Sequence, residues 1–206
     1  SIPTGVIAQS FVNGYDKAFA AYPKADAAKA KQLLAEAGYP NGFTITLNTP
    51  NDRYVNDEAI ATAVAGFLGR IGIKTEVSAR PIAMHSVSLT KADSDFYLYG
   101  WGVPTYDSAY IFDFLVHTRG KDSRGAQNAT HYSNADVDAK ILSLSSESDK
   151  ARRDATIKSI WETVQKERFY IALHDQVIHF ASVPRINVPV HPDNALHFKF
   201  VKFEKK

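Results

Sequence analysis

Residues 26–54 read DAAKAKQLLAEAGYPNGFTITLNTPNDRY, and this stretch decides the fold class. Its first half predicts a helix, because Asp26 can cap it, Gly38 can end it, and apolar residues recur between them at helical spacing. Residues 43–47 then alternate apolar and polar side chains as a half-buried strand does, and Pro50 ends the pattern. A helix followed directly by a strand indicates an α/β protein.

The next fifty residues repeat this alternation. A helix over about 56–71 precedes a strand over 73–79. A weaker helical pattern over 82–91 precedes an aromatic strand over 96–99. The order strand, helix, strand, helix, strand predicts an α/β fold with a mostly parallel or mixed sheet and flanking helices.

The flanking regions carry weaker patterns. We expect residues 1–24 to form an extended lead-in and residues 117–130 an exposed loop. Two helices should follow that loop, the first with a capping box of Ser133 and Asp136, the second capped by Asp149. Three later segments have strand patterns and need a sheet to join: 170–173, 177–183 and 197–203.

Composition narrows the classes of function. The chain has 206 residues, 45% of them hydrophobic, which is enough for a sizeable core. Its charges balance to a formal +2 without long runs of one sign, so no nucleic-acid partner is predicted. Cysteine is absent, which excludes disulfides, thiolate zinc sites and a cysteine nucleophile. The apolar runs are too short for a membrane-spanning helix, and residues 1–10 lack a signal-peptide pattern.

The motif survey finds no catalytic signature. None of the seven histidines pairs with another at i, i+4 spacing around a glutamate, so packed or surface histidines are the better interpretation. Neither a G-x-S-x-G elbow nor a phosphate-binding glycine loop occurs. We therefore predict no catalytic residues, no metal site and no cofactor.

Two segments that follow predicted strands carry groups suited to binding. Ligands of open α/β sheets bind beyond the carboxyl ends of the strands, where both segments should lie. The first segment supplies Asn51, Arg53 and Tyr54. The second, GWGVPTYD over residues 100–107, supplies Trp101, Gly102, Thr105, Tyr106 and Asp107. Their aromatic rings would wall a cleft in which glycines expose the backbone to a ligand; the competing interpretation is a core tryptophan between ordinary glycines.

The order of several segments resembles a known family. Besides residues 26–54, these are GIKTEVSARP (72–81), DFYLYGWG (95–102), HYSNADVDAKI (131–141) and YIALHDQV (170–177). Together they resemble the extracytoplasmic solute-binding proteins of ABC importers in the peptide/nickel class, family 5. The resemblance implies one lobe, the C-terminal one, of a periplasmic-binding-protein-like flytrap of type II, cluster C. It implies a ligand-binding lobe over residues 25–180 and a tail strand over 181–206 that returns to an N-terminal lobe outside this sequence.

The resemblance also implies a function without chemistry. Such a protein binds a peptide or other small polar solute between its lobes, outside the cytoplasm, and delivers it to permease subunits at the membrane. In several members an aspartate three residues after the GW tryptophan pairs with the free amine of the ligand. That position is Pro104 here, which leaves Asp107 as a possible substitute and keeps blocked peptides, glycans and metal chelates open. The alternatives are a hydrolase using Asp107, His131 or His174, and a chaperone-like protein that binds extended chains.

Overall fold

The computed structural model describes residues 2–22, 24–191 and 195–203. The first half of the chain contains β1 (Ile2–Pro3), α1 (Lys17–Ala20), α2 (Ala27–Glu36), β2 (Thr44–Pro50), α3 (Asp57–Gly69), β3 (Lys74–Arg80), α4 (Ile82–Lys91) and β4 (Phe96–Tyr97). The second half contains α5 (Ser108–Ile111), the π-helix η1 (Phe112–Val116), α6 (Ala135–Ser143), α7 (Lys150–Glu167), β5 (His174–Asp175), β6 (Ile186–Asn187), the 3₁₀-helix η2 (Phe198–Phe200) and β7 (Lys202–Phe203). Among the described residues, no helix combines the length and the apolar character needed to cross a bilayer.

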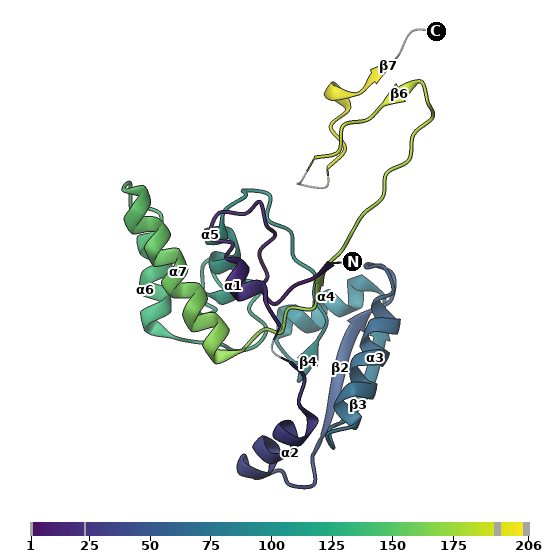
Figure 1. Ribbon diagram of the computed structural model, residues 1–206, viewed down its shortest axis with the longest axis vertical. Helices are drawn as coiled ribbons and strands as arrows, with labels where there is room; N and C mark the ends of the chain where they lie inside the picture. Colours follow the sequence, from purple (N-terminus) through teal and green to yellow (C-terminus); the bar gives the residue numbers. More distant parts are fainter. Residues whose placement is uncertain (1, 23, 192–194, 204–206) are drawn as a thin grey trace.

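A parallel sheet in the order β3-β2-β4 organises the first half. In this sheet Leu47 of β2 lies between Val77 of β3 and Phe96 of β4. The helix α3 runs beside β2 and β3 (Figure 1), as a crossover between parallel strands should. The predicted alternation of helix and strand over residues 26–99 is therefore confirmed, except that β4 has two residues rather than four.

Two glycines align the beginnings of β2 and β3. Gly42 has a left-handed φ of +74°, and a Cβ at this position would lie 1.8 Å from the carbonyl oxygen of Gly72. Such a distance is far inside van der Waals contact, so only glycine allows the turn before β2 to pack on the turn before β3. The hydrogen bond from the Lys74 N–H to the Phe43 carbonyl, 2.8 Å long, then starts the ladder.

The main hydrophobic core lies beside the sheet. It joins the N-terminal segment to α5, η1, α6 and α7, and its buried members include Val6, Val12, Phe112 and Trp161. Trp161 is fully buried; its indole N–H donates to Ser108 Oγ over 3.0 Å, and its ring contacts Phe112 at a centroid distance of 4.9 Å. Residues 4–20 therefore contribute buried side chains to this core.

The helix caps correct one prediction and confirm two. Asp26 and Asp149 cap α2 and α7 as expected, accepting hydrogen bonds from backbone N–H groups three residues on. The predicted capping box of Ser133 is wrong, because Asn134 is the N-cap of α6 and its side chain accepts from the first-turn N–H groups. Ser133 instead contacts Thr118 through its hydroxyl.

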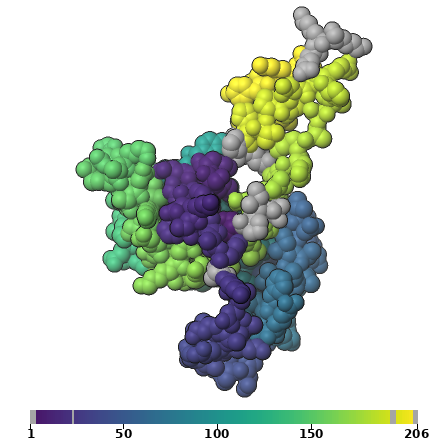
Figure 2. Space-filling model, viewed as in Figure 1, coloured from purple at the N-terminus to yellow at the C-terminus, as the bar shows by residue number. Residues whose placement is uncertain are grey.

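The strand predictions for the last quarter of the chain are mostly wrong. Residues 170–173 and 177–183 form no strand, and segment 197–203 begins with η2 before β7 pairs with β6. After β5 the chain extends away from the rest of the molecule (Figure 1; Figure 2), so residues 177–183 find no sheet edge to join. The side chains of Phe198 and Phe203 are each 77% exposed there.

We predict that Trp161→Phe lowers the free energy of unfolding by about 1–3 kcal/mol, because it leaves a cavity and removes the donor to the buried Ser108 hydroxyl. Urea denaturation measures this, with the exposed neighbour Glu162→Gln as the control. Equal stability of the two variants would show that the indole packing matters less than its burial indicates.

Candidate ligand-binding site

The structure brings the two predicted binding segments together. Tyr54 lies in the loop after β2, Gly100 lies after β4, and the Gly100 N–H donates to Tyr54 Oη over 3.0 Å. A Cβ at Gly100 would lie 2.6 Å from Tyr54 Cε1, so the tyrosine ring covers the bare backbone. The carboxyl ends of two adjacent parallel strands thus carry loops in direct contact, which is where ligands of such sheets bind.

Two buried or bonded carboxylates shape the first loop. Asp57 is only 4% exposed, and its Oδ2 accepts the N–H groups of Arg53 and Tyr54, each over 3.1 Å. Asp52 accepts the N–H of Ile82 over 2.7 Å and so ties the loop to the beginning of α4. Both carboxylates therefore hold the loop, and Asp57 is buried away from a ligand.

Arg53 is different. Its guanidinium lies 5.7 Å from the centre of the Tyr54 ring, and no ion pair to it occurs among the described residues. The backbone of Asn51 is used in the sheet, where its N–H donates to the Arg80 carbonyl over 3.0 Å. Arg53 is therefore a cation of this loop that has no described anionic partner.

Trp101 lies in an aromatic cluster. Its ring centre is 5.6 Å from Tyr110 and 5.9 Å from both Tyr99 and Phe114. The cluster packs against the main core, which fits the interpretation of a core tryptophan. The indole N–H of Trp101 is buried, yet it has no hydrogen-bond partner among the described residues.

Tyr99, in the same cluster, keeps its proton. Burial, followed by the nearby Tyr54, raises the pKa of Tyr99 to about 12, so its hydroxyl stays protonated and donates to Gln127 over 3.0 Å.

Asp107 is bound at both oxygens. Arg153 contacts them over 2.7 and 2.9 Å, the Ala109 N–H donates over 2.9 Å, and Asn13 Nδ2 donates over 3.1 Å. Burial raises the pKa of this carboxyl, but the hydrogen bonds from Arg153, Ala109 and Asn13 outweigh burial and hold it below its ordinary value. The structure therefore places Asp107 as the N-cap of α5 with its charge already paired.

The remaining residues of the second loop are accessible. Gly102 and Thr105 are exposed, and Tyr106 is 39% exposed in a left-handed conformation with φ of +55°. The Tyr106 ring meets Phe11 edge-on, with 5.6 Å between the ring centres.

Sequence reasoning missed Asn13, Arg153 and Phe11. Asn13 and Arg153 lie 94 and 46 residues from Asp107 in the chain, and no motif connects them. It also missed His85, which is 1% exposed on α4 and has Nε2 at 3.0 Å from the carbonyl oxygen of Leu98, next to the site. The only signals for these residues are ordinary polar side chains in otherwise apolar patterns.

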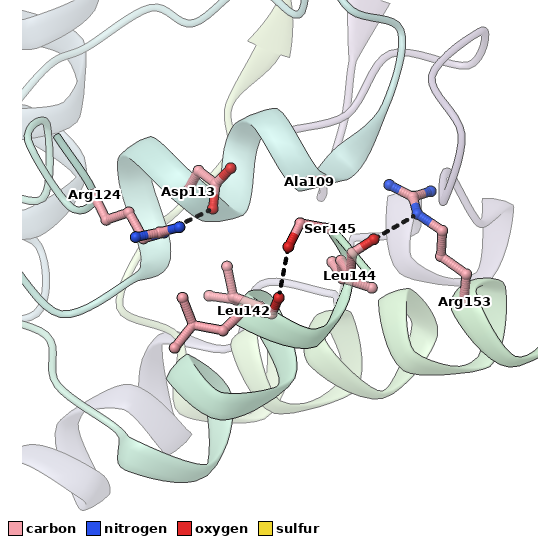
Figure 3. A pocket seen from close by; sticks show the side chains of 8 residues that line it. Ala109, Asp113, Arg124, Leu142, Leu144, Ser145 and Arg153 are labelled. Carbon is pink, nitrogen blue, oxygen red and sulfur yellow. Dashed lines mark hydrogen bonds and ion pairs between the residues drawn. The ribbon is translucent and has the colours of Figure 1, made fainter. Parts of the chain in front are cut away.

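A small cavity of about 80 Å³ is lined in part by Arg153, the residue that binds Asp107 (Figure 3). The cavity lies between α5–η1 and the turn that joins α6 to α7. Its charged lining is paired: Arg124 Nε is 3.9 Å from Asp113, and Arg153 binds Asp107. It contains none of the predicted site residues. Within the described residues, no group of three or more potential ligands is arranged to hold a metal ion.

We predict that acidification destabilises the protein through His85. Burial lowers the pKa of His85 in the folded state, so the unfolded chain binds more protons and the free energy of unfolding falls as the pH drops below about 6.5. His85→Gln should reduce this loss between about pH 7.5 and 5.5 in urea titrations, relative to the exposed control His131→Gln. A loss of equal size in both variants would contradict the assignment to His85.

Comparison with known proteins agrees with this fold. The sequence model described as bacterial extracellular solute-binding proteins, family 5 Middle, matches residues 1–123. The glutathione-binding protein GsiB of Pectobacterium atrosepticum is 25% identical over 181 residues, which cover 84% of this chain and 35% of that protein. This chain therefore spans about a third of the length of such relatives.

Solved structures share the fold at lower identity. The dipeptide-binding protein from Pseudoalteromonas sp. SM9913, in complex with Met-Leu, has a TM-score of 0.81 at 17% identity and covers 98% of this chain and 40% of its own. The binding protein AgaA from A. tumefacien R10, in complex with agropinic acid, has a TM-score of 0.73 at 24% identity, covering 84% of this chain and 35% of its own. The predicted periplasmic-binding-protein-like α/β fold is confirmed. Because the family model matches more than half of the sequence, this chain belongs to the bacterial extracellular solute-binding proteins, family 5.

Proposed function

We propose that this chain is one lobe of the solute-binding component of an ABC importer. The lobe holds one side of a cleft, and the whole protein delivers a small polar solute, such as a peptide, to permease subunits from outside the cytoplasm. Family membership supports the general role. The contact between Tyr54 and Gly100 is the observation that carries the location of the site, because it joins the two loops at the carboxyl ends of β2 and β4.

The charges of the two loops favour a ligand with a carboxylate. Asp52, Asp57 and Asp107 are all engaged by protein donors, whereas Arg53 has no described anionic partner. A guanidinium binds a carboxylate through two parallel hydrogen bonds. Glutathione, Met-Leu and agropinic acid, named for the similar proteins above, all carry carboxylates.

The aromatic residues and the free backbone complete this half of the site in our proposal. Trp101 and Tyr106 line the wall with Tyr54, Asn51 and Thr105 lie at its rim, and Gly102 leaves the backbone open to the ligand. Asp107 contributes by holding its loop in place. In our proposal a free amino group on the ligand, such as that of Met-Leu, pairs with the second lobe, because Arg153 already binds both oxygens of Asp107.

The other half of the site should come from a lobe outside this chain. The segment after about residue 180 exposes apolar side chains, including Phe180, Val183, Val190, Phe198 and Phe203. Exposed apolar surface of this kind marks an interaction face. We propose that residues 25–180 form the ligand-binding lobe and that the tail over 181–206 packs on the second lobe.

The two alternative functions have less support. Asp107 is paired with Arg153, His131 Nε2 contacts the Ala92 carbonyl oxygen, and His174 lies in β5. Among the described residues, no hydrogen bond or ion pair joins these three, so they form no catalytic relay. A chaperone role would use the exposed tail, which the proposal assigns to the second lobe.

Native mass spectrometry of the full-length protein tests the proposal directly. The protein should co-purify with, or be stabilised by, a small carboxylate-bearing solute, with glutathione and Met-Leu as first probes. Turnover of an ester, peptide or glycoside panel, or preferential binding of unfolded chains, would overturn it.

We predict that Arg53→Gln in the full-length protein weakens binding of such a solute by about 10- to 100-fold, because it removes a charged hydrogen-bond donor. Isothermal titration calorimetry measures the change. Arg70→Gln is a matched control, since Arg70 also lies over an aromatic ring, 5.2 Å from the centre of Phe67, but at the opposite end of the strands. Unchanged affinity in Arg53→Gln would remove Arg53 from the site.

A further inference from the structure

The end of the Gly100–Asp107 loop is held in a conformation that its own sequence disfavours. Tyr106 has a φ of +55°, in the left-handed region where a bulky side chain crowds the backbone. Non-glycine residues stay in this region when the surroundings over-determine them, and such residues cluster at functional sites. Something outside the loop must therefore hold Tyr106.

The N-terminal segment provides the first restraint. The Asn13 N–H donates to the Tyr106 carbonyl over 2.8 Å, and the Asn13 carbonyl accepts both the N–H and the hydroxyl of Ser108, over 3.0 and 2.6 Å. These bonds enclose Tyr106 and Asp107 from both sides. Phe11, two residues earlier, packs edge-on against the Tyr106 ring and is itself 49% exposed.

Arg153 on α7 provides the second restraint. Its two terminal nitrogens bind the two oxygens of Asp107, and its Nε donates to the Leu144 carbonyl over 3.3 Å. The guanidinium thus connects the loop to α7 and to the end of α6. Its side chain is only 23% exposed, so solvent weakens this pair less than it weakens a surface ion pair.

The rest of the loop is held mainly by packing. The Tyr54 ring covers Gly100, the Trp101 ring packs on its aromatic neighbours, and Val103 is buried in the main core. A turn bond 3.1 Å long from the Tyr106 N–H to the Val103 carbonyl joins this packed part to Tyr106. Thr105 and Tyr106, which are exposed, therefore lie between buried Val103 on one side and the restraints at Asn13 and Arg153 on the other.

We propose that Arg153 and Asn13 are positioning residues for the candidate site: they hold the Tyr106–Asp107 turn so that Tyr106, backed by Phe11, presents a fixed aromatic face to the ligand. The proposal rests on the proposed function for its ligand. Neither positioning residue needs to touch the ligand. Replacing either residue should lower the affinity for the ligand, because a loop that is already ordered loses less conformational entropy on binding.

The experiment combines hydrogen exchange with ligand binding in the full-length protein. The variants are Arg153→Met and Arg153→Lys, which keeps the charge but loses the two-point contact. A third variant, Asn13→Ala, removes the Nδ2 bond to Asp107 and keeps the backbone bonds of residue 13. The matched control is Arg152→Met, because Arg152 is the adjacent residue and pairs with Glu147 at the surface. Exchange is followed in peptides covering residues 8–16 and 100–110, with peptides from α3 as an internal reference.

We expect Arg153→Met to speed exchange about tenfold or more at the amides of Asn13, Tyr106 and Ser108, while α3 and the Arg152→Met control stay unchanged. Binding of glutathione or Met-Leu, whichever saturates the wild type, should weaken by about 3- to 30-fold. Arg153→Lys should give an intermediate result on both measurements. Urea titrations show whether each variant is folded. If Arg153→Met does not fold, Asn13→Ala provides the test in its place.

Unchanged exchange at residues 8–16 and 100–110 in both Arg153→Lys and Asn13→Ala would overturn the proposal, whatever the ligand result. Faster exchange with unchanged affinity would also overturn it, because the turn would then not matter to binding. If the wild type binds neither probe, that result counts against the proposed function, and the exchange measurement alone decides whether Arg153 and Asn13 position the loop.

Discussion

The hydrogen bond between Trp161 and Ser108 lies where three distant parts of the chain meet. The Ser108 hydroxyl accepts from the indole on α7 and donates to the Asn13 carbonyl of the N-terminal segment. A buried hydroxyl must find partners for both its proton and its lone pairs, so these contacts specify one packing of the three segments. The position of α5, and hence of the loop that precedes it, depends on this arrangement.

The charged side chains near this packing determine which groups the candidate site offers to a ligand. Carboxylates at helix beginnings accept hydrogen bonds from backbone N–H groups, and Asp107 is in addition paired with Arg153. Arg53 remains with only the Tyr54 ring beside it. The same sequence could have offered an anionic site had Asp107 been free, so the pairing of Asp107 decides which ligand chemistry the loops favour.

The C-terminal segment leaves apolar side chains exposed. Its side chains are as apolar as those of a strand, yet β6 and β7 pair only with each other and leave Phe198 and Phe203 exposed. A hairpin alone buries too little surface to be stable in water, whereas a sheet or a second lobe would cover it. The chain spans about a third of the length of its relatives.

The sequence by itself determined the helices and strands over residues 26–99, most of the caps, and the family, because periodicity and capping act over a few residues and are visible in order along the chain. It also predicted two binding loops, which the structure places in contact through Tyr54 and Gly100. Only the tertiary structure decided that Asp107 is paired, that Asn13 and Arg153 hold its turn, and that residues 170–173 and 177–183 form no strands. Each of these features depends on partners far away in the chain. A strand forms only where the fold places another strand beside it, and a carboxylate stays free only where the fold places no donor beside it.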